Sequence, residues 1–414
     1  MINLPDTSKS KAEKHAQCLK NQNDILLDLR LQSRWAAFLV FSPCVFAALS
    51  CWSIIRDEPF ASLYLLPALL VAVHIARYLY RHLTANHLSS QSDHLFPTLG
   101  VANWVTLLRA AAVVLLAGLL PFTIRSDSGL SDPTTLAWVS AIMYLLISFS
   151  DLLDGYMARN RGRETELGKK LDIETDAAGI LVASLLAVAL SRLPVGYLFV
   201  GLAYYPFAFG IWLRKRRKQP LVSLKSRPYA RIIAGFQMGL VALALMPVFK
   251  TPFTHLAAYI FMVPFLIGFV RDWLIVSCRI TTNADQQSSQ DLWIRSRVVS
   301  TLPLVFRLVI ILATPAIIAQ SASFRAHLSW HLVLCLFSIL SAIGCIGRIA
   351  SLLLILMLGS RYSPYGETIL PLTLFASAAA LLLSGTGIMS IYSPEDAILY
   401  RHSQEDKRAK CELT

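Results

Sequence analysis

A charged segment that joins two apolar runs decides how this chain folds. The runs are TTLAWVSAIMYLLISFS at residues 134–150 and IETDAAGILVASLLAVALSRL at residues 173–193, and DLLDGYMARNRGRETELGKKLD lies between them at residues 151–172. Each run approaches the roughly 20 residues that a helix needs to cross a membrane. The sequence therefore predicts two membrane-spanning helices with carboxylates at their facing ends.

The composition of the whole chain agrees with an integral membrane protein. Of its 414 residues, 55% are apolar and 15% are charged, and the mean hydropathy is +0.56. Soluble domains carry about 25% charged residues. These values exclude a disordered chain, a collagen-like repeat and a small disulfide scaffold. We expect an all-α polytopic helical bundle.

Apolar stretches near 20 residues predict about twelve transmembrane helices. Basic residues gather in alternate connecting segments, which supports an even count with the N-terminus in the cytoplasm. One stretch, 347–360, is short, so ten or eleven spans remain open. The stretches are 35–55, 60–80, 100–122, 134–150, 173–193, 194–213, 229–249, 253–277, 300–320, 328–346, 347–360 and 368–391.

These spans suggest four regions along the chain. Residues 1–98 hold a cytoplasmic segment and two spans, and residues 99–280 hold six spans. A polar cytoplasmic linker at 281–299 precedes a four-helix membrane unit with a cytoplasmic tail at 300–414. The last region weakly resembles the DoxX-type membrane proteins in its ending GTGIMSIYSPEDAIL, and this resemblance identifies no chemistry.

The net charge of +13 points to a membrane surface. The basic clusters lie between apolar runs without interleaved aromatic residues, a distribution that favours anionic lipid headgroups or phosphorylated substrates over nucleic acid. About thirty polar residues precede the first apolar run, so no cleavable signal peptide is expected. Together with the short loops, this favours a bacterial plasma membrane.

Four aspartates carry the chemistry of the charged segment. Asp151 and Asp154 are three residues apart and Asp172 and Asp176 are four apart, so each pair shares a helix face. Clustered carboxylates repel one another unless cations neutralise them, and hard oxygen ligands suit Mg²⁺ or Mn²⁺. Such a site favours transfer to or from a diphosphate, with one carboxylate as general base. The alternative is a solvated charged loop between two spans.

The same residues resemble a family signature. Asp151-x₂-Asp154-Gly155-x₂-Ala158-Arg159-x₈-Gly168-x₃-Asp172-x₃-Asp176 is similar to the signature of the CDP-alcohol phosphatidyltransferases at every fixed position and spacing. The resemblance implies a six-helix membrane core with its site at the cytoplasmic end. It also implies two divalent cations, Mg²⁺ or Mn²⁺, a CDP-linked donor attacked at its β-phosphate by an alcohol, and release of CMP. Family members commonly form homodimers.

The resemblance assigns roles by position. It makes Asp151, Asp154 and Asp172 metal ligands, and Asp176 both the catalytic base and a metal neighbour. Four further positions would line the cytidine diphosphate site: Gly155, Ala158, Arg159 and Gly168.

A second patch, NWVTLLR, places Asn103, Thr106 and Arg109 on one helical face. The family often has a similar Asn-x-x-Thr-x-x-Arg near the nucleotide, which makes Asn103 and Thr106 nucleotide contacts and Arg109 a contact for an acceptor phosphate. In the alternative interpretation Asn103 caps the helix, Thr106 bonds back to its own helix and Arg109 extends toward the membrane surface.

A basic patch at residues 214–231 predicts the acceptor. Arg227 and Arg231 would bind its phosphate, and Arg231 resembles in position a lysine of phosphatidylglycerophosphate synthases, although the glycine, second lysine and threonine of that pattern are missing here. CDP-diacylglycerol and glycerol 3-phosphate are therefore the leading substrates. Inositol phosphate or another polyol phosphate comes next, and CDP-choline or CDP-ethanolamine with diacylglycerol is the reverse arrangement. A transporter or membrane scaffold without catalysis is the alternative of another class.

Overall fold

The computed structural model contains α-helices, short 3₁₀ helices and three isolated bridges over the residues it describes. The structure describes residues 23–45, 65–88, 95–124, 132–161, 165–222, 228–280, 289–320, 325, 327–385, 387 and 390–392. Within these ranges the side chains are described except at 152–161, 228–231 and 289–300. The chain divides into two compact units, Met1–Ala189 and Leu190–Thr414.

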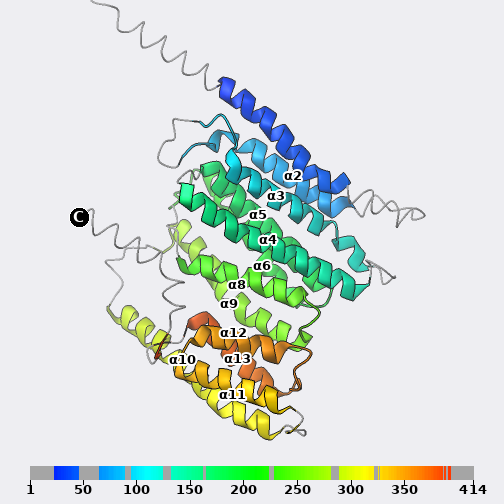
Figure 1. The fold of residues 1–414 in the computed structure, drawn as a ribbon. Coiled ribbons are helices and arrows are strands. Elements are labelled where there is room, and N and C mark those ends of the chain that lie inside the picture. Colours follow the sequence, from blue (N-terminus) through cyan, green and yellow to red (C-terminus); the bar gives the residue numbers. More distant parts are fainter. Residues whose placement is uncertain are drawn as a thin grey trace, which may run out of the picture. The chain divides into compact units, whose positions relative to one another are not determined.

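The first unit is a layer of long helices that pack side by side (Figure 1). A helix at residues 23–45 comes first. It is followed by α2 (Leu66–Arg81), η2 (Leu83–Ala85), α3 (Gly100–Ala117), η3 (Leu120–Ile124), α4 (Pro133–Arg161) and α5 (Glu166–Ala189). Helix α3 packs against α2, α4 and α5. Buried alanines and a glycine on α5, such as Ala178, Gly179 and Ala183, let these helices approach closely.

Helix α4 begins where a proline and a capping aspartate meet. Pro133 is its first residue, where its missing N–H costs no helical bond. The Oδ2 atom of Asp132 accepts hydrogen bonds from the backbone N–H of Thr135 at 2.8 Å and from its hydroxyl at 3.0 Å. These bonds hold the pKa of the Asp132 carboxyl below its ordinary value. The cap fixes the start of the helix that carries Asp151.

The second unit begins with a broken helix. Helix α6 (Leu198–Leu202) follows η5 (Val195–Tyr197), and α7 (Tyr204–Arg216) continues after a bend of 40°. The remaining helices are α8 (Pro228–Leu245), α9 (Thr251–Val276), α10 (Ser289–Ala319), α11 (Leu328–Ile343), α12 (Gly347–Gly359) and α13 (Ile369–Ser384). Helix α10 therefore starts inside the segment 281–299 that the sequence assigned to a linker. Within this unit α9 packs against α12 and α13.

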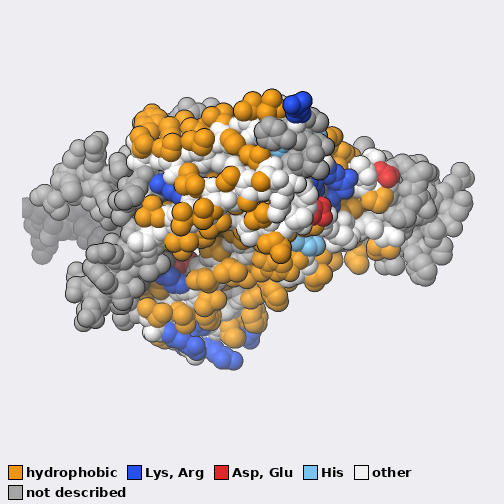
Figure 2. Space-filling view, turned by 90° about the horizontal axis from the view of Figure 1, so that it is seen from below, with side chains coloured by type: hydrophobic (Ala, Val, Ile, Leu, Met, Phe, Trp, Pro, Cys, Tyr) orange, Lys and Arg blue, Asp and Glu red, His pale blue; other side chains and the backbone are white. Residues whose placement is uncertain are grey.

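The helices fit the predicted apolar stretches. Among the described residues each stretch falls on a helix, and 194–213 falls on the bent pair α6–α7. Over the part of the chain that the structure describes, four helices are long and apolar enough to cross a membrane, or five if the bent pair is one span, and four shorter apolar helices accompany them. Apolar side chains cover much of the face in Figure 2, as expected for contact with lipid. The chain is an all-α integral membrane protein, and the count of twelve spans stays a prediction.

A buried arginine closes one helix end in the second unit. Arg192 is 7% exposed, and its guanidinium donates to the carbonyl oxygens of Ala244 at 3.1 Å, Met246 at 2.7 Å and Phe249 at 2.7 Å. These carbonyls belong to the last turn of α8 and the loop after it, where the helix leaves acceptors without intrahelical partners. Arg192 therefore fixes the α8–α9 connection.

Replacing Arg192 with alanine should destabilise the second unit. The change leaves three carbonyl acceptors without their charged donor, a loss of about 2–4 kcal/mol. Thermal unfolding of the purified protein in one detergent should show a lower midpoint temperature. Lys215→Ala, at an exposed position on α7, serves as the control and should leave the midpoint unchanged. Equal midpoints for both variants would contradict the capping role.

Candidate metal centre

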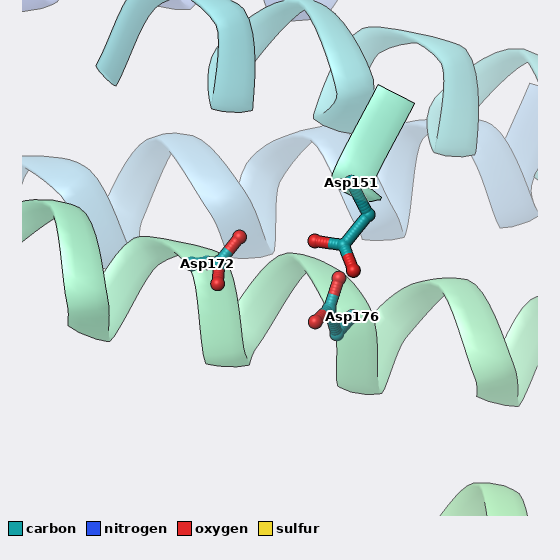
Figure 3. Close-up of side chains that lie close together, drawn as sticks. All are labelled: Asp151, Asp172 and Asp176. Carbon is teal, nitrogen blue, oxygen red and sulfur yellow. The ribbon is translucent and has the colours of Figure 1, made fainter. Parts of the chain in front are cut away.

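Helices α4 and α5 bring three of the four signature aspartates together. Asp151 lies on α4, and Asp172 and Asp176 lie one turn apart on α5, with their carboxylates turned toward one another (Figure 3). One carboxylate oxygen from each residue lies within 4.8 Å of the others. All three side chains are partly buried. The spacing of four residues places the two α5 carboxylates on the same face, as the sequence predicted.

Arg109 on α3 contacts all three carboxylates. Its Nη1 atom lies 2.8 Å from Oδ1 of Asp151 and 2.8 Å from Oδ1 of Asp172, and its Nη2 atom contacts Asp176. The Arg109 side chain is only 2% exposed. A buried guanidinium is stable in this position because carboxylates surround it. Three carboxylates and one guanidinium still leave a formal charge of −2 in the cluster.

The other members of the NWVTLLR patch lie close to the signature or to their own helix. Asn103 is buried, and its Nδ2 atom donates to Oγ1 of Thr165 at 3.4 Å, just before α5. The Thr165 hydroxyl also accepts the backbone N–H of Gly168 at 3.0 Å. The hydroxyl of Thr106 donates to the carbonyl of Ala102 at 3.2 Å, so it bonds back to its own helix.

The glycine at position 168 lets α3 and α5 meet. A Cβ atom built on Gly168 would lie 2.6 Å from Oδ1 of Asn103 and 3.2 Å from Oγ1 of Thr165. The first distance is too short for any real contact. A larger residue at position 168 would therefore displace the Asn103 side chain, so the glycine matters here for close approach rather than for backbone conformation.

Several predicted site residues lie outside the described side chains. Arg227 falls between described ranges. For five other residues the helical backbone is described but the side chains are not: Asp154, Gly155, Ala158 and Arg159 on α4, and Arg231 on α8. Their roles stay predictions.

The donor set fits a divalent cation. Mg²⁺ and Mn²⁺ prefer carboxylate oxygens as ligands. The three aspartates offer such oxygens within 4.8 Å of one another, which is close enough for them to bind a shared ion. The cluster keeps a negative formal charge after its pairing with Arg109, and a divalent cation would neutralise it. Asp151, Asp172 and Asp176 would hold the ion.

A groove between α3 and α4 is lined in part by Arg109, the residue that contacts the three aspartates. Its volume is about 250 Å³. Arg109 and Ser150 are the polar members of its lining, and Leu108 and Leu146 on its walls are 59% and 65% exposed. The remaining lining residues are Val105, Ala112, Met143 and Ile147.

The sequence did not predict that Arg109 binds the aspartates. The three-residue spacing of Asn103, Thr106 and Arg109 indicated a shared face but not the helix that this face meets. One signal was available, because an arginine in the middle of an apolar helix needs an anionic partner at that depth. The groove left no signal, since apart from Arg109 and Ser150 its residues are ordinary apolar positions of two spans.

A carboxylate cluster that could hold a cation, beside an arginine and at apolar helices, is the kind of site that a membrane enzyme acting on phosphorylated substrates uses. Residues 99–270 match the family model of the CDP-alcohol phosphatidyltransferases, a family of transferases of substituted phosphate groups. The family transfers a phosphatidyl group from a CDP-alcohol in phospholipid synthesis and typically uses a divalent metal. No curated protein and no solved structure matches the chain.

Adding a methyl group at position 168 should disturb the packing of Asn103 between α3 and α5. Gly168→Ala forces Asn103 or the helix backbone to move, at a cost of about 1–3 kcal/mol. Both the thermal midpoint and the affinity for Mn²⁺ should fall. Gly239→Ala is the matched control, because it adds a methyl group inside α8 where nothing lies within 4 Å. A Gly168→Ala protein with the midpoint of the control would show that the close approach is not required.

Proposed function

We propose that the chain transfers the phosphatidyl group of CDP-diacylglycerol to a polar alcohol and releases CMP. The observation that carries this proposal is the meeting of Asp151, Asp172 and Asp176 around Arg109 within the family segment. This arrangement provides oxygen ligands for a cation and a fixed positive charge beside them. A diphosphate donor requires both, because negative charge grows on its bridging oxygen during transfer.

The apolar groove between α3 and α4 supports a lipid donor. Exposed leucines form its walls and Arg109 lies in its lining, so an acyl chain in the groove would place its headgroup near the aspartates. CDP-choline and CDP-ethanolamine carry no acyl chain that could lie in this groove. The groove supports a lipid substrate, which is CDP-diacylglycerol in the proposed arrangement and diacylglycerol in the reverse arrangement with CDP-choline or CDP-ethanolamine.

The transfer step can be written with the chain's own groups. The acceptor hydroxyl attacks the β-phosphorus, a new oxygen–phosphorus bond forms, and the bond from that phosphorus to the bridging oxygen breaks. CMP leaves with the bridging oxygen, and the hydroxyl proton moves to a carboxylate oxygen of Asp176. Asp151 and Asp172, with Asp154, would hold two Mg²⁺ or Mn²⁺ ions, which would supply charge stabilisation at the phosphates. Arg109 orients the carboxylates.

Glycerol 3-phosphate is the proposed acceptor, with inositol phosphate or another polyol phosphate as the next candidates. The basic residues Arg227 and Arg231 support a phosphorylated acceptor by their charge and position in the sequence. The basic connecting segments support an active site that faces the cytoplasm of a bacterial cell. Contacts of Asn103 and Thr106 with the nucleotide belong to the same proposal, and the homodimer implied by the family stays a prediction.

The purified protein should release CMP from CDP-diacylglycerol when Mg²⁺ or Mn²⁺ is present. Glycerol 3-phosphate, inositol phosphate, inositol and serine should be offered one at a time, and release should occur with a phosphorylated acceptor. Chelation with EDTA should abolish the release, and added Mn²⁺ should restore it. Turnover of CDP-choline without turnover of CDP-diacylglycerol would overturn the proposed donor. Absence of release with every donor and acceptor would favour a non-catalytic role.

Two aspartate variants should separate the proton acceptor from the metal ligands. Asp176→Asn should lower turnover at least about 100-fold, because the amide cannot take the hydroxyl proton, while CDP binding stays within about twofold. Asp151→Asn should weaken Mn²⁺ and CDP binding together. Turnover and calorimetric titration with CDP measure the two effects. Near-normal turnover by Asp176→Asn would refute the assignment of the base.

A further inference from the structure

A third carboxylate of α5 lies on the side away from the aspartate cluster. Glu174 is two positions from both Asp172 and Asp176, which turns it by about 200° around the helix axis. It is 3% exposed. A carboxylate buried in a membrane-embedded helix is costly unless a partner compensates it. Glu174 therefore needs a partner from the helix that packs against this side of α5.

His74 on α2 is that partner. Its Nε2 atom lies 2.6 Å from Oε1 of Glu174, and the imidazole N–H donates this hydrogen bond. The two residues are 100 positions apart. The His74 side chain is 44% exposed and that of Glu174 is 4% exposed, so the carboxylate is the member that depends on the bond. Helix α2 also lies before residue 99, outside the segment that matches the family.

Contacts on two sides of α5 constrain its rotation. On one side Arg109 contacts Asp172 and Asp176, and on the other His74 contacts Glu174. Each residue of a helix occupies about 100° of the circumference, so a rotation of α5 by one residue position would turn both aspartates away from Asp151. Loss of the His74 bond would also remove a hydrogen-bond donor from this buried carboxylate and weaken what holds it on this side of α5.

We propose that His74 and Glu174 are positioning residues of the active site: their hydrogen bond fixes the rotation of α5 so that Asp172 and Asp176 face Asp151 and share a cation. A helix outside the family segment thereby completes the metal centre. This inference rests on the proposed function, because it assigns the pair a role in holding the ligands of that same site.

Binding of Mn²⁺ to the full-length protein in lipid nanodiscs tests the proposal without any substrate. Electron paramagnetic resonance of free Mn²⁺ gives the affinity. His74→Ala should bind Mn²⁺ about tenfold more weakly than the wild type, the lower end of the loss seen when groups that orient metal ligands are removed. His74→Gln, whose amide N–H can donate to Glu174, should regain most of the affinity. Ser341→Ala, which removes the buried 2.9 Å bond between Ser341 and Ser351 in the second unit, should bind like the wild type.

A double substitution covers the case in which His74→Ala does not fold. In His74→Leu/Glu174→Leu both polar partners are replaced by apolar side chains, so no unpaired carboxylate stays buried. This variant should fold and should still bind Mn²⁺ about tenfold more weakly. Wild-type affinity in the double variant would overturn the proposal. Loss of folded protein in both variants, judged by size-exclusion chromatography, would assign the pair to folding alone and overturn it too.

The outcomes separate this inference from the proposed reaction. A wild-type protein that binds Mn²⁺ but releases no CMP refutes the reaction, and the comparison of variants still decides the role of His74. A wild-type protein that releases CMP, with Mn²⁺ affinities that do not differ among the variants, refutes the positioning role alone. Where turnover is present, the Mn²⁺ concentration for half-maximal activity should rise about tenfold in His74→Ala while the KM for CDP-diacylglycerol changes less than about twofold.

Discussion

The contact between Arg109 and three aspartates is the constraint on which the rest of the first unit depends. Carboxylates at membrane depth are tolerated only when a positive charge or a polar partner compensates them. Arg109 supplies that charge from α3 to residues on α4 and α5, so the three helices must keep one mutual register. Small side chains on α5 and the glycine at position 168, which lies opposite Asn103, allow α3 and α5 to pack closely. This close packing lets the Arg109 guanidinium contact the carboxylates of α5.

Much of the fold and part of the site could be predicted from the sequence because they depend on local patterns. Apolar runs predicted the helices, since hydrocarbon leaves the backbone no other way to satisfy its hydrogen bonds. The four-residue spacing predicted that Asp172 and Asp176 share a face, and the family signature predicted that Asp151 joins them. These three residues do come together. The residues around them were identified with less success because their partners are distant in the sequence.

Arg109 and Glu174 illustrate that limit. Arg109 meets residues 63 and 67 positions later, and Glu174 meets a residue 100 positions earlier, and no periodicity encodes which helices are neighbours. The number of spans is undecided for a related reason. The charged residues of the site lower the mean hydropathy of α5 below that of an ordinary membrane span. Helices α6 and α7 are separated by a 40° bend, so neither is long enough to be counted as a span by itself. Charged side chains that form a site within a membrane helix lower the hydropathy by which such a helix is recognised.

The division of the chain at Ala189 and Leu190 has a consequence for the idea of a transferable catalytic module. The family segment spans this division, so its first helices belong to one compact unit and its last helices to the other. Helix α3 packs on α2, and α9 packs on α12 and α13 through contacts such as Phe253 with Phe375, whose ring centroids are 5.1 Å apart. A gene fragment trimmed to the family borders would remove both partners and expose surfaces evolved for protein rather than lipid. In this chain helices on both sides of the family segment pack against helices inside it, so a transplanted signature region would lack these packing partners.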